Sequence, residues 1–227
     1  DHRDLHSFPT RRSSDLCAFP NVAVFAEEWS AKRFVVSYTR AKKDPFAASM
    51  IISSFLSAFG VSMIASVLYM AILSWQFPLL GDVSDIGFLQ NVGGYANGGL
   101  AISGNFFLYY LMEFITQGCL MGLFSSLATL LSIKLTDSNI AVVMPMILYI
   151  IVTNIMNLLS IPRLLNPYHV YSQSGTVYRT FFPGGTESFS VISMLYPLIY
   201  TAVLLGVFLL FAYFMIKRKY GKYKDIG

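Results

Sequence analysis

Charged residues are scarce in this sequence: Asp, Glu, Lys and Arg make up 12% of its 227 residues, whereas hydrophobic residues make up 55%. A soluble domain carries about 25% charged residues. The charges are also unevenly placed, because four long stretches contain none: Phe46–Gly81, Phe114–Ile133, Ser138–Pro162 and Ser188–Ile216. Each reaches about the 20 residues that a helix needs to cross the hydrocarbon core of a bilayer. The sequence therefore predicts an all-α integral membrane protein rather than a soluble domain.

Cysteine and histidine are rare too, with two cysteines and three histidines in the whole chain. Cys17 and Cys119 are far apart in the sequence, so they indicate neither a disulfide framework nor a metal-ligand spacing. His2 and His6 lie close to the N-terminus, and His169 stands alone in a predicted loop. We therefore expect no metal site.

The familiar catalytic motifs are also missing. The chain has no G-x-x-x-x-G-K-[ST] loop for nucleotide phosphates, no H-E-x-x-H pair for zinc and no G-x-S-x-G turn for a nucleophilic serine. Intramembrane hydrolysis by paired carboxylates is not expected either, because Glu113 is the single acidic residue within the predicted spans. The sequence thus predicts no catalytic residue, no cofactor bound by this chain and no enzyme activity of its own.

Four membrane spans are predicted, at about residues 46–75, 104–133, 140–160 and 189–216, and together they make a transmembrane domain over residues 46–227. A short polar turn, Lys134–Asn139, separates the second span from the third. A long loop with several prolines, Ile161–Glu187, is expected before the fourth span, in which Pro197 marks a kink or the true start of the helix.

The basic residues predict how the chain crosses the membrane. They gather in the Glu27–Pro45 segment, at Lys134 and in the Lys217–Lys224 tail, whereas the other side of the predicted spans holds only Arg163 and Arg179. Basic residues favour the cytoplasmic side. We therefore expect a multi-pass protein of the cell (plasma) membrane with both ends cytoplasmic. Because membrane topology accounts for the net charge of +4, no nucleic-acid partner is expected.

The first 45 residues are expected to form two segments. Residues 1–16 are polar, and the string Ser7–Leu16 resembles a translated sequencing adapter, which predicts a non-native segment; a native polar tail is the alternative. Residues 17–45 are predicted to hold the end of a truncated helix and then an amphipathic segment at the membrane surface, because aromatic residues interrupt its charges.

Small residues recur at helical spacing in the first two predicted spans. Ser49, Ser53, Ser57 and Gly60 share one face of the first, and Gly118, Gly122 and Ser126 form a stripe in the second. Small residues allow close approach of helices in a membrane, where lipid provides no hydrophobic drive for helix association. Both faces are therefore predicted to pack against other helices.

Polar side chains within the spans are the candidates for a site. Glu113 is followed by Thr116 and Gln117, and the third predicted span carries Asn154 and Asn157 on one face. A carboxyl at membrane depth is costly and usually faces the interior of a bundle. Two interpretations stay open for both groups: a substrate- or proton-binding site, or structural hydrogen bonds between helices.

The segment before the first complete span resembles the permease subunits of type-2 ATP-binding-cassette (ABC) exporters. The resemblance rests on an acidic pair and tryptophan, Glu27, Glu28 and Trp29, followed by an amphipathic stretch that ends near Arg40 and leads directly into a span. In that family this stretch is the coupling helix that docks into a separate ATPase subunit. Many members have a glycine after the acidic pair, where this chain has Ser30-Ala31.

The resemblance implies further properties. Family permeases have six spans with both ends cytoplasmic, so the four spans here would be the last four, with two helices missing before Cys17. The implied partners are an ABC ATPase subunit that binds ATP, a second permease subunit and the lipid bilayer. The alternative function is an ion-coupled secondary carrier or a non-transporting membrane scaffold. The class of substrate does not follow from the sequence.

Overall fold

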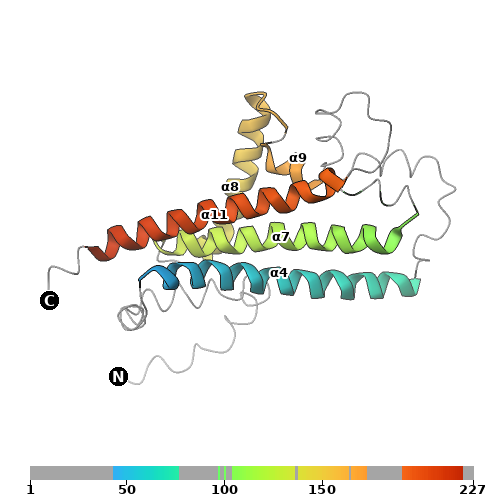
Figure 1. Ribbon diagram of the computed structural model, residues 1–227, viewed down its shortest axis with the longest axis horizontal. Coiled ribbons are helices and arrows are strands. Elements are labelled where there is room, and N and C mark those ends of the chain that lie inside the picture. Colours follow the sequence, from blue (N-terminus) through green and yellow to red (C-terminus); the bar gives the residue numbers. More distant parts are fainter. Residues whose placement is uncertain are drawn as a thin grey trace, which may run out of the picture. The chain divides into compact units, whose positions relative to one another are not determined.

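The computed structural model describes residues 43–76, 97, 100, 104–135, 138–163, 165–172 and 191–221. Five helices lie in this part of the chain: α4 (Lys43–Gln76), α7 (Phe106–Ser132), α8 (Ser138–Leu158), α9 (Pro167–Ser172) and α11 (Val191–Gly221) (Figure 1). The described residues contain no strand. The all-helical fold class is therefore confirmed for this part of the chain.

Four of these helices are long and apolar enough to cross a membrane, as the charge-free stretches predict. Their apolar portions are Ala48–Trp75, Phe106–Ser132, Ile140–Leu158 and Met194–Arg218. In the most apolar stretch of α7, 56% of the residues are buried, whereas 6% to 17% are buried in the corresponding stretches of the other three helices. Within the described chain, α7 is therefore the helix that the others cover most.

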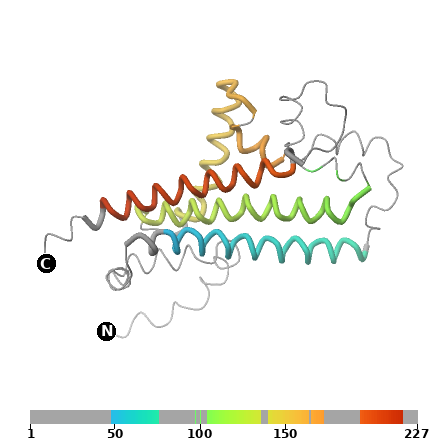
Figure 2. Tube along the Cα trace, in the orientation of Figure 1, coloured from blue at the N-terminus to red at the C-terminus, as the bar shows by residue number. Residues whose placement is uncertain are grey.

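The short helix α9 was not predicted, because it lies inside Ile161–Glu187, whose prolines indicate a loop. Asn166 explains why a helix begins here: its side-chain Oδ1 accepts a hydrogen bond from the backbone N–H of Tyr168 at 3.0 Å. Asn at this position caps a helix, and Pro167 suits its first turn because proline lacks only an N–H that would have no partner there. Figure 2 follows the chain from the end of α8 into α9.

The described residues divide into two compact units, and each of the four long helices contributes a stretch to both. Unit 1 holds residues 43–61, 121–135, 138–147 and 204–221. Unit 2 holds residues 62–76, 97, 100, 104–120, 148–163, 165–172 and 191–203. Each unit is described by itself below.

Unit 1 has an apolar core in which α7 lies between α4 and α11 (Figures 1 and 2). Its buried side chains come from α4, from the end of α7 with the turn after it, and from α11: Met50 and Ile51, Leu130 and Ile133, Ala212 and Ile216. A smaller contact joins α7 to α8, where Ala128 meets Ala141 and both are fully buried. The two alanines allow these helices to approach closely.

A cluster of buried hydroxyl groups joins α4 to α7 in unit 1. Thr129 donates its hydroxyl hydrogen to the Ser125 carbonyl at 2.9 Å and its oxygen lies 2.7 Å from that of Ser54, which donates to the same carbonyl at 3.2 Å. Ser125 can then donate its own hydrogen to Ser54 at 2.8 Å. All three residues are fully buried. Because each hydroxyl finds a partner, α4 and α7 can pack here without an unpaired polar group.

Next to this cluster, the backbones of α4 and α7 approach through two residues of the predicted stripe. A Cβ atom added at Gly122 would lie 2.6 Å from the ring of Phe55, and the Ser126 hydroxyl donates to the Ile51 carbonyl at 3.4 Å. Gly118, the third member of the stripe, is buried in the part of α7 that belongs to unit 2.

The other predicted small-residue face does not make the contact between α4 and α7. Ser49 and Ser53 are exposed, and nothing lies within 4 Å of a Cβ added at Gly60. Ser53 and Ser57 donate their hydroxyls to carbonyls three residues back in their own helix. Ser54, one position further on, faces α7 instead, so the face of α4 that contacts α7 lies beside the small-residue face.

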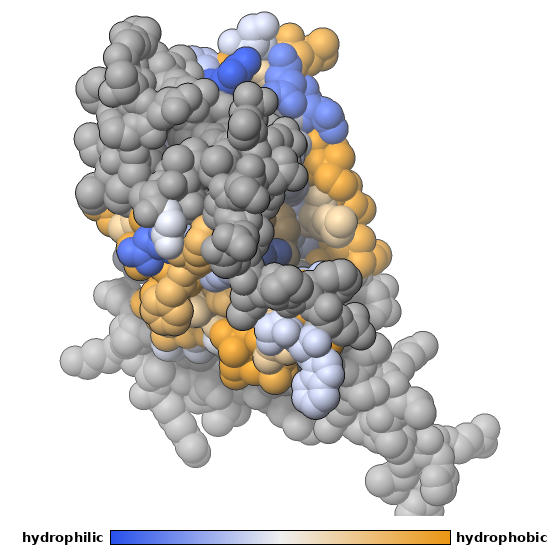
Figure 3. Space-filling view, turned by 90° about the vertical axis from the view of Figure 1, so that its right-hand side faces the viewer, coloured by the Kyte–Doolittle hydropathy of each residue, from blue (hydrophilic) through white to orange (hydrophobic). Residues whose placement is uncertain are grey.

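Large apolar side chains are exposed along the long helices, and hydrophobic residues make up much of the visible surface of the described part (Figure 3). In α4 they include Leu56, Ile64, Leu68 and Ile72, each more than half exposed. A soluble monomer rarely exposes apolar patches of this extent. These helices therefore need an apolar environment along their length.

Candidate functional site

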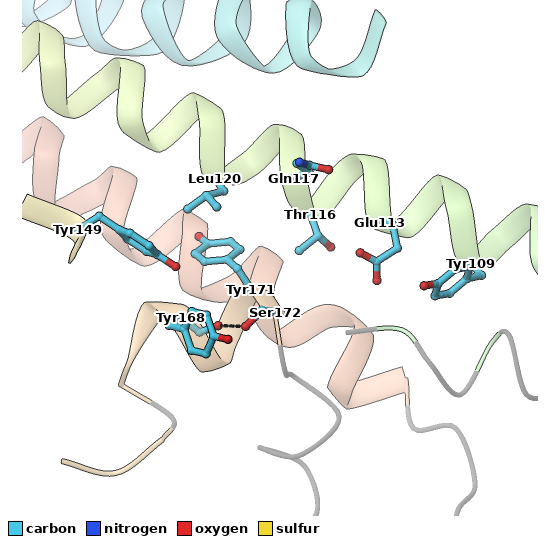
Figure 4. Close-up of a pocket in the computed structure, with 9 residues that line it drawn as sticks. All are labelled: Tyr109, Glu113, Thr116, Gln117, Leu120, Tyr149, Tyr168, Tyr171 and Ser172. Atoms are coloured by element: carbon cyan, nitrogen blue, oxygen red, sulfur yellow. Dashed lines mark hydrogen bonds between the residues drawn. The ribbon is translucent and has the colours of Figure 1, made fainter. Parts of the chain in front are cut away.

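A partly open pocket of about 310 Å³ lies in unit 2. Its wall combines four tyrosines with a carboxyl, an amide and two hydroxyl groups: Tyr109, Glu113, Thr116, Gln117, Leu120, Tyr149, Tyr168, Tyr171 and Ser172 (Figure 4). The residues come from α7, α8 and α9. Pockets that bind small molecules begin at about this volume.

Glu113 gives the pocket its carboxyl group. The side chain is half-buried, and its Oε1 accepts a hydrogen bond from the Asn97 side-chain amide at 3.2 Å. Asn97 is itself buried and has a φ of 58°, in the left-handed region that asparagine tolerates better than most residues. An amide donor fixes the carboxyl in place without neutralising a negative charge on it.

Thr116 lies one helical turn from Glu113, and its hydroxyl is the unusual feature of the pocket wall. The residue is only 2% exposed, yet its Oγ1 has no hydrogen-bond partner in the described part of the chain. In Figure 4 this oxygen points to the side on which the Glu113 carboxyl lies. Buried hydroxyl groups are nearly always paired, so an orphaned one in a pocket wall indicates a place for a polar ligand atom.

Tyr171 is held in place by a chain of hydrogen bonds that ends in α11. Thr201 donates its hydroxyl hydrogen to the Pro197 carbonyl at 2.7 Å, which leaves Tyr171 as the donor to Thr201, also at 2.7 Å. Pro197 lies inside α11, so of the two predicted alternatives the structure does not place the start of the helix there. Burial raises the pKa of Tyr171, which therefore stays neutral and keeps its proton for this bond.

Tyr200 of α11 contacts Tyr171 and the turn before α9. The rings of Tyr171 and Tyr200 meet edge to face with centroids 6.0 Å apart, and the Tyr200 hydroxyl donates to the Leu165 carbonyl at 3.0 Å. These contacts attach α9 and the turn before it to α11. Tyr171 is therefore held in place before any ligand binds.

The predicted polar residues have different surroundings. Glu113 and Gln117 both line the pocket, but Gln117 is exposed and projects from the other side of α7 in Figure 4. Asn154 is exposed and donates to the Ile150 carbonyl of its own helix. Asn157 accepts a hydrogen bond from the Asn166 side chain at 2.7 Å. The structure thus brings Glu113 and Gln117 to one pocket and does not add the two asparagines to it.

The predicted coupling residues Glu27, Glu28, Trp29 and Arg40 lie outside the described residues, as do residues 1–16. Among the described residues no group of three metal-ligating side chains occurs. The four tyrosines and Asn97 were not predicted. Tyr109 lies one turn before Glu113 on the same helix, whereas the other three tyrosines and Asn97 come from other segments of the chain. An excess of tyrosine, 14 in all, is the one signal that the sequence offers.

Comparison of the chain with models of protein families, with curated proteins and with solved structures gives no match.

Proposed function

We propose that this chain is the membrane-spanning permease subunit of an ABC exporter in the cell membrane, driven by an ATPase on a separate chain. The observation that carries the proposal is the order of segments: an acidic pair with Trp29, then a basic amphipathic stretch, then directly the first long apolar helix, α4. ATP binding would close the ATPase dimer, and the coupling segment would pass that movement to α4.

The apolar character of the helices supports the membrane part of this proposal. Four helices have the length and composition of membrane spans, and they expose large aliphatic side chains that water would solvate poorly. A helix satisfies most of its backbone polar groups internally, as a bilayer requires of any segment that crosses it.

The ends of the helices in unit 1 support a cytoplasmic location for both chain ends. Lys134 follows α7, and Lys217 and Arg218 lie in the last turns of α11; all three are exposed. In Figures 1 and 2 these two helix ends and the start of α4 point the same way. Basic residues concentrate on the cytoplasmic side of membrane proteins.

Single cysteines in place of Asp85 and Lys222 test this topology. In intact cells, a membrane-impermeant maleimide is expected to label the first position directly and the second only after the membrane is opened. Labelling of the Lys222 position from outside would overturn both the topology and the assignment of the coupling segment.

The ATPase partner is tested by co-purification. A reading frame next to this one that encodes a G-x-x-x-x-G-K-[ST] ATPase is co-expressed with the chain, and a tagged permease is purified. We expect the ATPase to be retained, and to be lost when Trp29→Ala is combined with Glu27→Gln and Glu28→Gln, because a buried aromatic anchor often contributes on the order of 2 kcal/mol or more to an interface.

Trp75 provides the matched control, because it is the other of the two tryptophans in the chain and is 92% exposed at the far end of α4. Trp75→Ala should keep the ATPase bound. If the triple variant still retains the ATPase and still supports transport, the segment is an ordinary juxtamembrane loop and the permease proposal fails. A secondary carrier, which the half-buried carboxyl of Glu113 also suits, would be active without any ATPase.

A further inference from the structure

The pocket of unit 2 is lined by an acidic residue and by no basic residue. Among its nine lining residues Glu113 is the single acidic residue, and there is no lysine, arginine or histidine. The one hydrogen bond that the described residues offer its carboxyl comes from the neutral amide of Asn97. An ionised carboxyl at membrane depth is costly unless a compensating positive charge lies beside it. The pocket therefore favours a cation and disfavours an anion.

The acceptors on the wall favour a cation that carries N–H groups. The Glu113 carboxyl and the orphaned Thr116 hydroxyl lie one helical turn apart on α7, and both oxygens face the same side of the pocket in Figure 4. A protonated amine has up to three N–H donors, so it can donate to both at once. A quaternary ammonium group has no donor for Thr116.

The tyrosines match the remainder of such a molecule. In Figure 4, Tyr171 lies next to Thr116 with Tyr149 and Tyr168 beyond it, and Tyr109 lies on the other side of Glu113. Aromatic faces attract cations and also cover apolar groups, so an ammonium head and an apolar or aromatic tail both find suitable surfaces. The volume of about 310 Å³ suits a small amine.

We propose that this pocket binds a small protonated amine, with the ammonium group at Glu113 and Thr116 and its apolar tail against the tyrosines. That the amine is the transported substrate rests on the proposed function; that it binds does not. The same head group occurs in a free amine and in the phospholipid phosphatidylethanolamine, so the test must distinguish these two sources.

The binding test uses 2-phenylethylamine, which is protonated at neutral pH, and the uncharged 2-phenylethanol, which has the same size and ring. Binding to the purified full chain is measured by equilibrium dialysis in nanodiscs of phosphatidylglycerol, without any ATPase. We expect saturable binding of the amine and no saturable binding of the alcohol. Adding phosphatidylethanolamine to the nanodiscs should leave amine binding unchanged; competition would mean that the lipid head group occupies the site.

Two variants test the residues. Glu113→Gln keeps the size of the side chain but removes its charge, and it should weaken amine binding by about thirtyfold or more, as loss of a buried charge partner does. Thr116→Val removes the hydroxyl at nearly constant shape and should weaken binding by about tenfold or more, the effect of one hydrogen bond to a charged group.

Thr153→Val is the matched control, since Thr153 is buried in unit 2, donates to the Ile150 carbonyl of its own helix and does not line the pocket. It should bind the amine normally. The proposal is overturned if the alcohol binds as well as the amine, if Glu113→Gln binds with unchanged affinity, or if phosphatidylethanolamine displaces the amine.

The amine-site proposal and the permease proposal can each fail while the other stands. If the amine binds through Glu113 but no ATPase associates and no ATP-driven transport occurs, the site stands and the permease proposal fails. If the ATPase co-purifies and supports transport while the amine does not bind, the permease proposal stands and the amine site is wrong.

Discussion

Replacing Gly122 with leucine is expected to lower the free energy of unfolding by about 3 kcal/mol, because it forces a large side chain into a filled space. Even a single Cβ at this position would lie 2.6 Å from the ring of Phe55, which is closer than two carbon atoms can pack. The four carbons of leucine would separate α4 from α7 and weaken the buried hydroxyl bonds next to this contact. Unfolding by SDS titration in lipid–detergent micelles measures the loss.

Gly60 is the matched control for this substitution. It lies in α4, also within an apolar helix, but a Cβ added there would have nothing within 4 Å. Gly60→Leu should therefore leave stability unchanged or raise it slightly, since leucine has a better helix propensity than glycine. If the two leucine variants are equally destabilised, the close approach at Gly122 is not what holds α4 against α7.

A double substitution tests whether Phe55 is the residue that Gly122 contacts. Phe55→Ala removes the ring that Gly122 accommodates, so Gly122→Leu should cost less in that background. We expect a coupling energy of about 2 kcal/mol between the two positions, as is found for residues in direct contact. Additive effects would contradict the contact.

Replacing Asn166 with alanine is expected to destabilise α9 by about 2 kcal/mol, from the loss of a helix cap and of a buried hydrogen bond. The Asn166 side chain is 1% exposed, donates to Asn157 Oδ1 at 2.7 Å and accepts from the Tyr168 N–H at 3.0 Å. Without it, the N-terminus of α9 loses its cap and its attachment to the end of α8. Hydrogen exchange of the α9 amides should become faster.

Asn154→Ala is the matched control, because Asn154 is exposed on the same helix as Asn157 and bonds to a carbonyl of its own helix. Exchange in α9 should not respond to it. Equal acceleration by both variants would mean that the asparagine pair acts through α8 as a whole and that Asn166 is not a specific cap.

The long helices could be predicted from the sequence because one property, the absence of charged residues, marks their length. A charge-free stretch of sufficient length has to be a helix in an apolar environment, and the predicted span at 104–133 corresponds to a helix over Phe106–Ser132. The helix α9 escaped prediction for the opposite reason. Its six residues are too few to show a hydrophobic period, and only the cap at Asn166 and Pro167 marks its start.

The candidate site could be predicted only along one helix. Glu113, Thr116 and Gln117 are close in sequence, so helical spacing alone groups them. Tyr149 and Tyr171 lie on α8 and α9, and their arrival at the same pocket depends on how helices pack, which no period within one helix reveals. The serines of α4 show the same limit. The four-residue period indicates Ser53, but the serine that contacts α7 is Ser54.

The hydroxyl cluster in unit 1 also determines how α4 can move along α7. A slide of α4 by one helical turn, about 5.4 Å, would bring Met50 or Ala58 to the place of Ser54. The hydroxyls of Ser125 and Thr129 would then face a side chain that offers them no hydrogen bond, whereas a displacement of both helices together breaks none of these bonds. Within unit 1, a push along the first turns of α4 is therefore passed to residues 121–132 of α7 through these hydroxyl bonds.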